Sequence, residues 1–519
     1  MPESSPSDPW VSVPQRTWGQ TVRALLQRNV LAMLLLGFSA GIPLLLIFSS
    51  LSLWLGEAGV ERKAVTMFSW AALGYSFKFV WAPLVDRMPL PLLTRWMGRR
   101  RSWLLLAQTG VMASIWGMSS VDPSQGVEAL HMMAWFAVGL GFTAATQDIV
   151  IDAWRIESAG TDLQALMSSA YIAGYRVGMI VSGAGALYMA SYWGSAKESY
   201  QYLAWAQTYQ SMAMVLMVGW LTTWWIQEPK VETSQATPSS HQQHARTLLL
   251  FALGVSAFVW VFVTLDDWMV AWRSEPTQGA LGALLMEALK LLLALIAASL
   301  VGFLAVRAHL VHAQTARETW LAPVLDFFKR YGSMAVWVLA LIGLYRISDI
   351  VLGVISNVFY QDLGYTKPEI ATAVKTFGVA VSILGGFWGG IWASRWGMMR
   401  SLWWGAVLSA LTNLLFVGLA TWGPTLPGLY LVIAADNLAA GFASAAFVAF
   451  LSSLTQVQFT AVQYAIFSSL MTLLPKTLGG YSGAMVDHMG YPGFFTLTAL
   501  MGLPVLALIF WMGRRMPKS

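Results

Sequence analysis

WAPLVDRMPL (residues 81–90) and GGIWASRWGMMRS (residues 389–401) each close a long apolar run with a polar residue followed by arginine. These pairs are Asp86-Arg87 in the first stretch and Ser394-Arg395 in the second. A short turn that contains glycine and arginine follows in both places. Because the pattern recurs in the second half of the chain, we predict an internal repeat.

The apolar runs have the length of membrane-spanning helices. Of the 519 residues, 57% are hydrophobic and 11% are charged, which is too apolar for an ordinary soluble protein. The runs are continuous rather than alternating, which favours helices over a transmembrane barrel. We therefore predict an all-α polytopic membrane protein with fourteen spans, near 30–54, 64–86, 102–119, 127–152, 166–190, 203–226, 247–265, 280–306, 334–359, 369–393, 401–421, 427–452, 462–486 and 491–513.

Lysine and arginine are unevenly distributed over the loops between these spans. If the N-terminus is cytoplasmic, the inner loops and tails hold 20 of these cations and the outer loops hold 5. Positively charged loops stay on the cytoplasmic side of a membrane. We expect both termini to be cytoplasmic. The net charge of +6 then reflects topology, and no nucleic-acid partner is predicted.

Six spans precede and six follow an inserted pair, with a glycine- and arginine-containing turn after the second span of each half. This pattern resembles the major facilitator superfamily, which implies two six-helix bundles. The stretch 317–332 is amphipathic, and we expect it to lie along the inner membrane surface. The predicted domains are an N-terminal segment (1–29), an N-terminal bundle (30–226), a linker with two extra transmembrane helices and an interfacial helix (227–333), a C-terminal bundle (334–513) and a tail (514–519).

Two carboxylates lie one helical turn apart in TQDIVIDAWR (146–155), at the inner end of a predicted span. Burial disfavours the charged form of a carboxylate, so Asp148 is a candidate proton carrier, although a purely structural role fits equally well. For Asp152 we favour a latch with Arg155 or with the basic turn 95–101. The residues assigned to an inner gate are Asp86, Arg87, Asp152 and Arg155.

A second ionic group lies in GLYRISDIVLGVISN (343–357), where Arg346 and Asp349 are three residues apart and share a helical face. The two form either an inert neutral pair or an exchange site, in which protonation of Asp349 frees Arg346 to hold an anion. Asp436 is a third candidate for proton coupling, beside Asp148 and Asp349.

The predicted spans hold more cations than acids, which favours an anionic or carboxylate-bearing substrate. Amides and tyrosines beside the charges add hydrogen bonds and flat apolar faces. The candidate substrate-binding residues are Arg346, Lys476, Arg176, Lys78, Lys375, Gln147, Asn437, Tyr75, Tyr175 and Tyr345.

No known catalytic pattern is present in the sequence. We find no phosphate-binding loop, no H-E-x-x-H, no G-x-S-x-G and no cysteine. We therefore predict no enzymatic activity, no metal site and no cofactor. Transport would then depend on a proton gradient or on the gradient of the substrate.

Several stretches resemble the AmpG-type muropeptide permeases of Gram-negative inner membranes. They are LGFSAGIPL (36–44), KFVWAPLVDR (78–87), GRRRSWLLL (98–106), TQDIVIDAW (146–154), LYRISD (344–349), DNLAAGFASAAFVAFL (436–451) and QYAIFSSL (463–470). By position, Gln147, Asp148 and Asp152 are the polar members of the most specific motif, and Asp349 and Asp436 occupy the acidic places of the second half.

The resemblance implies import of N-acetylglucosaminyl-1,6-anhydro-N-acetylmuramyl peptides from periplasm to cytosol by proton symport. It further implies a multi-pass protein of the bacterial inner membrane, with roles in cell-wall recycling and β-lactamase induction. The partners implied are this glycopeptide and the lipid bilayer. The alternatives are a related permease for another bulky anion, such as an acyl-CoA or a nucleotide sugar, and a non-transporting membrane sensor. The oligomeric state stays open.

Overall fold

The computed structural model describes residues 18–60, 68, 75, 77–196, 199–230, 241–273, 280–310, 313–479 and 482–515. The chain divides into two compact units. The first comprises Met1–Ala82, Pro89–Val231 and Val336–Ser519, and the second comprises Pro83–Met88 and Glu232–Ala335. Each unit is built from helices.

The N-terminal half of the first unit contains helices at the predicted spans, some of them interrupted by π-helical turns, except that residues 64–67, 69–74 and 76 of the predicted span 64–86 lie outside the described residues. The predicted span 30–54, for example, consists of α2, a π-helical turn (η1) and α3. The elements are α1 (Trp18–Leu25), α2 (Arg28–Leu45), η1 (Leu46–Ser50), α3 (Leu51–Glu57), η3 (Lys78–Val80), α7 (Leu93–Met97), α8 (Arg99–Ser119), η4 (Pro123–Gln125), α9 (Val127–Ser158), α10 (Thr161–Ile180), η5 (Val181–Gly185), α11 (Ala186–Tyr192), α12 (Tyr202–Val215) and α13 (Met217–Trp225). The helix α6 (Ala82–Arg87) belongs to the second unit from Pro83 onward.

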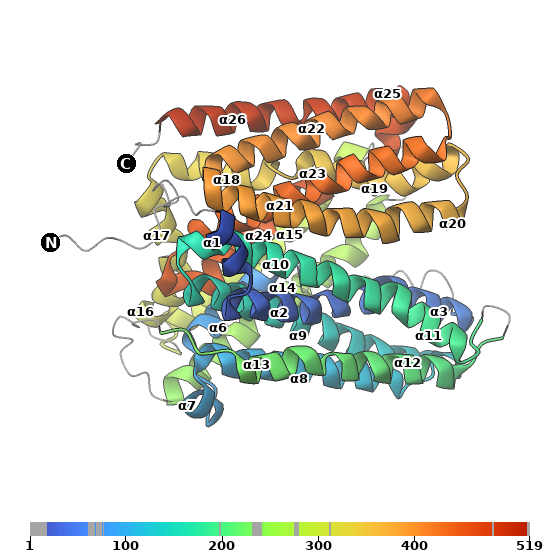
Figure 1. Ribbon diagram of the computed structural model, residues 1–519. Coiled ribbons are helices and arrows are strands. Elements are labelled where there is room, and N and C mark those ends of the chain that lie inside the picture. Colours follow the sequence, from blue (N-terminus) through green and yellow to red (C-terminus); the bar gives the residue numbers. More distant parts are fainter. Residues whose placement is uncertain are drawn as a thin grey trace. The chain divides into compact units, whose positions relative to one another are not determined.

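The C-terminal half of the same unit repeats this plan, and its long helices run beside one another (Figure 1). Its first predicted span is broken, because Arg346 leaves the helical conformation (φ −98°, ψ 8°) between α18 and α19. The elements are α18 (Met334–Leu344), α19 (Ile347–Asp362), α20 (Lys367–Ile370), η7 (Ala371–Phe377), α21 (Gly378–Trp396), α22 (Met398–Trp422), α23 (Leu426–Ser453), η8 (Val457–Phe459), α24 (Thr460–Gly479), α25 (Ser482–Leu500) and α26 (Gly502–Arg515).

The described part of the chain contains eight segments that are long and apolar enough to cross a membrane. They are Arg28–Leu45, Val127–Ser158, Leu248–Leu265, Met334–Ser356, Thr372–Trp396, Met398–Trp422, Leu426–Ser453 and Met485–Arg514. The protein is therefore a multi-pass, all-helical membrane protein.

The turns that contain glycine and arginine have the same backbone geometry in both halves. Gly98 precedes α8 with φ 85° and ψ 174°, and Gly397 precedes α22 with φ 87° and ψ 162°. Residues with a side chain rarely adopt a positive φ of this size, which explains why glycine recurs at both places. The repeat noticed in the sequence thus corresponds to a repeated helix-turn-helix corner.

The second unit contains α14 (His241–Arg273), which packs against α15 (Ala280–Arg307), followed by α16 (Ala313–Ala316), the π-helical turn η6 (Arg317–Leu321) and α17 (Ala322–Tyr331). Leu321, Val324, Leu325 and Phe328 form an exposed apolar face. Trp320, which lies in the same amphipathic stretch, packs instead against Leu250 and Ala305. A π-helical turn has more residues than an α-helical turn, and this shifts Trp320 away from the face.

Glycines allow two helix pairs in the first unit to approach until their backbones touch. A Cβ on Gly41 of α2 would lie 2.1 Å from the carbonyl oxygen of Tyr175 on α10. A Cβ on Gly385 of α21 would lie 2.2 Å from the carbonyl oxygen of Leu438 on α23. Backbone atoms cannot rotate out of the way as a side chain does, so these positions require glycine for close packing.

We expect Gly41→Ala and Gly385→Ala to destabilise the protein by about 1–3 kcal/mol each, because the added methyl group forces two backbones apart. Thermal unfolding of the purified protein in detergent, followed by tryptophan fluorescence, measures this loss. Gly353→Ala on α19 is the matched control, since a Cβ there meets nothing within 4 Å. Equal unfolding temperatures for all three variants would contradict the packing argument.

Candidate functional site

Asp152 on α9 is held between two cations in the interior of the first unit. Its carboxylate lies 3.1 Å from Nη2 of Arg155 and 3.9 Å from Nζ of Lys78. The side chains of all three are at most 9% exposed. The predicted pairing of Asp152 with Arg155 is confirmed, and Lys78 is a buried partner that the sequence did not reveal.

Asp148, one turn away on the same helix, has a different environment. Its carboxylate accepts a long hydrogen bond of 3.5 Å from the hydroxyl of Tyr171 on α10. No cation forms an ion pair with it among the residues that the structure describes. Its charge acts on the hydroxyl groups of Tyr75, Tyr171 and Tyr175, which therefore lie around it. Asp148 is a buried acid among tyrosines, and the nearby charge of Lys78, which is paired with Asp152, acts on it without forming an ion pair.

Gln147 is completely buried beside this acid. Neither its Nε2 nor its Oε1 has a hydrogen-bond partner among the described residues, and the same holds for the hydroxyl group of Tyr75. Buried polar atoms are normally paired, because an unpaired one loses its bonds to water without replacement. This region is therefore polar enough to accept hydrogen bonds from, or donate them to, a bound molecule.

Arg155 also joins the two halves of the first unit. Its Nη1 donates to Ser452 Oγ on α23 at 2.6 Å and to Ser168 Oγ on α10 at 2.9 Å. Its guanidinium carbon lies 5.1 Å from the ring centre of Tyr464 on α24. A completely buried cation of the N-terminal half is thus fastened to two helices of the C-terminal half.

The second ionic group has the predicted partners. Nε of Arg346 lies 3.2 Å from Oδ2 of Asp349, and Nη1 donates to Ser444 Oγ on α23 at 2.6 Å. The charges of both residues act on Asp436, so this third acid lies in the same group. The predicted pairing of Arg346 with Asp349 is confirmed, and the break between α18 and α19 occurs at this pair.

The remaining candidate substrate-binding residues differ in their contacts. Tyr345 donates to the carbonyl oxygen of Leu402 at 3.1 Å and stacks on Phe447, so its hydroxyl group and one ring face serve packing. Asn437 donates to the carbonyl oxygen of Ile433 at 3.0 Å. Arg176 is half-buried on α10. The side chains of Lys375 and Lys476 lie outside the described residues.

The four residues predicted as a gate are divided between the two units. Asp86 and Arg87 belong to the second unit, whereas Asp152 and Arg155 belong to the first. Within the second unit, Nη1 of Arg87 lies 3.2 Å from Glu318. A hydrogen bond from Gln314 and the neighbouring Arg87 lower the pKa of Glu318, so this ion pair persists at neutral pH.

The basic turn 95–101 pairs with Glu157 and Glu228 and not with Asp152, which corrects one of the two alternatives considered for that acid. Arg100 forms an ion pair of 2.5 Å with Glu157, and both side chains are 1% exposed. Glu228 accepts the backbone N–H groups of Arg100 and Arg101 at 2.8 and 3.0 Å. A carboxylate at a helix N-terminus satisfies donors that have no partner in the helix.

We expect Arg100→Leu to cost about 3–5 kcal/mol of stability, because it leaves Glu157 buried and unpaired. The double variant Arg100→Leu/Glu157→Leu should recover most of that loss, since no buried charge remains. Thermal unfolding in detergent measures both, with Arg95→Leu as a control at an exposed arginine of the same turn. A double variant as unstable as the single one would show that the pairing is not the cause.

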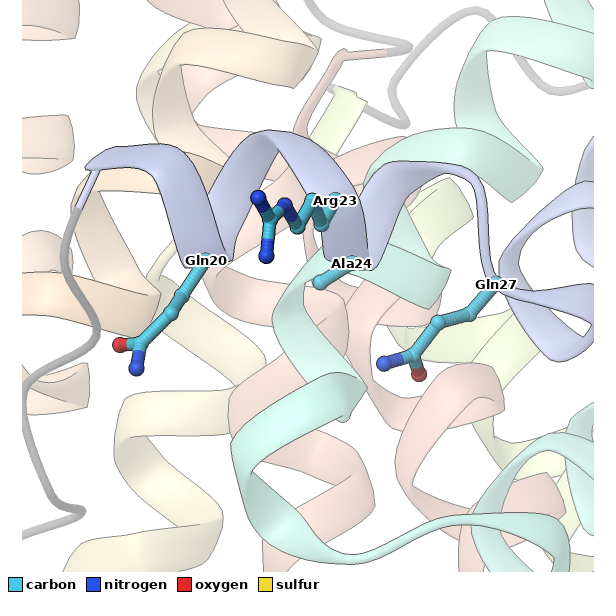
Figure 2. A pocket seen from close by; sticks show the side chains of 4 residues that line it. All are labelled: Gln20, Arg23, Ala24 and Gln27. Atoms are coloured by element: carbon cyan, nitrogen blue, oxygen red, sulfur yellow. The ribbon is translucent and has the colours of Figure 1, made fainter.

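One shallow hollow lies apart from these groups, on α1. Gln20, Arg23, Ala24 and Gln27 line it (Figure 2). None of the candidate site residues is among them, so the hollow is a surface feature of the first helix.

Comparisons with known proteins agree with this architecture. A family model described as "Acetyl-coenzyme A transporter 1" matches residues 29–227. The proton:xylose symporter XylE, a major facilitator superfamily protein, has the same fold, with a TM-score of 0.57 and 13% identity over 96% of each chain.

Two curated relatives match nearly the whole chain. A protein of Rickettsia felis named as an AmpG transporter (AmpG 4) is 28% identical over 93% of this chain and 95% of its own length. The anhydromuropeptide permease of Escherichia coli K12 is 26% identical over 94% of this chain and 81% of its own length. Over nearly its whole length the chain is therefore similar to AmpG-type transporters, and it has the fold of the major facilitator superfamily.

Proposed function

We propose that this protein imports 1,6-anhydro-muropeptides from the periplasm to the cytosol across the bacterial inner membrane. The observation that carries the proposal is the likeness to the anhydromuropeptide permease over 94% of the chain. The buried ionic groups add chemical support, because a muropeptide offers carboxylates and amides together with a disaccharide. We extend the proposal to the roles that such import serves, cell-wall recycling and induction of β-lactamase.

The contrast between two acids on α9 supports the proposal of proton symport. Asp152 is neutralised by Lys78 and Arg155, whereas Asp148 has a tyrosine hydroxyl group as its described partner. A bound proton supplies to Asp148 the neutralisation that Asp152 receives from cations. A site that loads and releases a proton during the transport cycle has this character.

The Arg346–Asp349 pair provides the second half of the coupling. Protonation of Asp349 removes the counter-charge of Arg346, which then attracts an anionic group of the substrate. Release of the substrate restores the pair and returns the proton. The charges of Arg346 and Asp349 act on Asp436, and we propose that Asp436 shares this proton.

For the conformational cycle we propose alternating access between two six-helix bundles. Fourteen spans, cytoplasmic termini, bundles at 30–226 and 334–513, and an insertion at 227–333 remain our assignment, supported by the separate compactness of Glu232–Ala335. We assign the contact of Arg155 with Ser452 to the inner gate, because it joins the two halves near the predicted inner end of α9.

Uptake of labelled anhydro-muropeptide into proteoliposomes tests the coupling. We expect a proton gradient that is directed into the vesicles, with the acidic side outside, to stimulate uptake. An uncoupler should abolish this stimulation. Asp148→Asn and Asp349→Asn should each reduce the stimulation by about 10-fold or more, because neither amide can carry a proton. Asp326→Asn on α17 is the control for an acid outside the site. Uptake that ignores the uncoupler would exclude proton symport.

A specific observation favours a second candidate, the transport of an acyl-CoA. The family model that matches residues 29–227 bears the name of an acetyl-coenzyme A transporter. Competition separates the two: unlabelled anhydro-muropeptide should inhibit uptake of the labelled compound, and a large excess of coenzyme A should not. Inhibition by coenzyme A alone would favour the second candidate.

A further inference from the structure

Arg176 differs from the other described cations of the candidate site in having no compensating acid. Lys78 and Arg155 share Asp152, and Arg346 has Asp349. Among the described residues, no hydrogen bond or ion pair engages the guanidinium group of Arg176. It lies half-buried on α10, a helix of the first unit, so water compensates its charge only in part.

The surroundings of Arg176 add a second positive charge. The groups whose charges act on it are Arg346, from the other half of the unit, and the neighbouring Tyr175. Helix α10 packs against α23, which also carries Ser444, the hydroxyl partner of Arg346. Two guanidinium groups from the two halves therefore repel each other in a medium of low dielectric constant.

An anion placed between the two guanidinium groups would remove this repulsion. Guanidinium presents a planar fork of donors that matches a carboxylate or a phosphate through paired hydrogen bonds. Arg346 can turn to such an anion when Asp349 is neutral, whereas Arg176 is available at every stage. The two arginines thus have different tasks, exchange for Arg346 and selection for Arg176.

We propose that Arg176 is a specificity-determining residue that, together with Arg346, binds a carboxylate of the transported molecule. The inference rests on the proposed function, in which the stem peptide of the muropeptide supplies this carboxylate. Because the two arginines belong to different halves, the bound carboxylate connects them. An uncharged analogue leaves Arg176 uncompensated and is a poor substrate.

The test compares two forms of one compound in proteoliposomes that contain the full-length protein. These are anhydro-muropeptide with free stem-peptide carboxylates and the same compound with those carboxylates amidated. We expect the wild type to prefer the acid by about 10- to 100-fold, mainly through KM, as expected for hydrogen bonds to a charged group. Arg176→Gln should abolish this preference, and Arg176→Lys should retain part of it, since lysine keeps the charge without the fork.

Two controls separate recognition from folding. Arg23→Gln makes the same change of charge in the surface hollow on α1 and should behave as the wild type (Figure 2). The unfolding temperature of Arg176→Gln should equal or exceed that of the wild type, because the variant loses an uncompensated charge. Arg346→Gln should unfold at a lower temperature, because it leaves Asp349 without its partner.

The outcomes distinguish this inference from the proposed function. Equal uptake of acid and amide, or an unchanged preference in Arg176→Gln, overturns the inference and leaves muropeptide import standing. If the wild type takes up neither form, thermal-shift titrations with coenzyme A and with anhydro-muropeptide decide. One outcome is that coenzyme A or anhydro-muropeptide shifts the unfolding temperature of the wild type and that Arg176→Gln abolishes this shift. That outcome refutes muropeptide import but retains the anion site. The absence of a shift, or a shift that does not depend on Arg176, overturns the inference.

Discussion

A charge in the interior of a membrane protein must be compensated by the protein, because lipid offers neither ions nor hydrogen bonds. Much of the described interior of this protein is arranged around that constraint. Asp152 lies between two cations, Arg346 is paired across a helix break, and Arg100 is paired with Glu157. The pairs Lys78–Asp152 and Arg100–Glu157 connect α9 with η3 and with α8, so charge compensation there also fixes how these elements pack.

The exceptions to compensation indicate where chemistry can occur. Asp148 forms no ion pair, Gln147 has two unpaired polar atoms, and Arg176 has no acid, all within the described residues. Leaving such groups buried lowers stability, and natural proteins tolerate this mainly where a ligand or a proton completes the environment. The uncompensated groups belong to α9 and α10, whereas the compensated pair of Arg346 and Asp349 lies at the break between α18 and α19.

The helix contacts provide a mechanical counterpart to this electrostatic arrangement. Glycines bring α2 against α10 and α21 against α23 at backbone distance, which makes each of these pairs stiff. The contact that joins the halves through Arg155 consists of a hydrogen bond to Ser452 and a ring contact with Tyr464. Stiff pairs joined by contacts that can break and re-form are suited to rigid-body rocking.

The sequence by itself determined the class of the protein, because hydropathy, loop charge and the repeated glycine-arginine turns are local properties. It also identified the pairs Asp152–Arg155 and Arg346–Asp349, since residues three apart on a helix are neighbours whatever the rest of the chain does. Tertiary structure decided the contacts of Arg100 with Glu157 and of Arg155 with Ser452, which are separated by 57 and 297 residues. It also decided which charges stay uncompensated. Such contacts depend on which helices become neighbours, and the periodicity of a single helix contains no information about that.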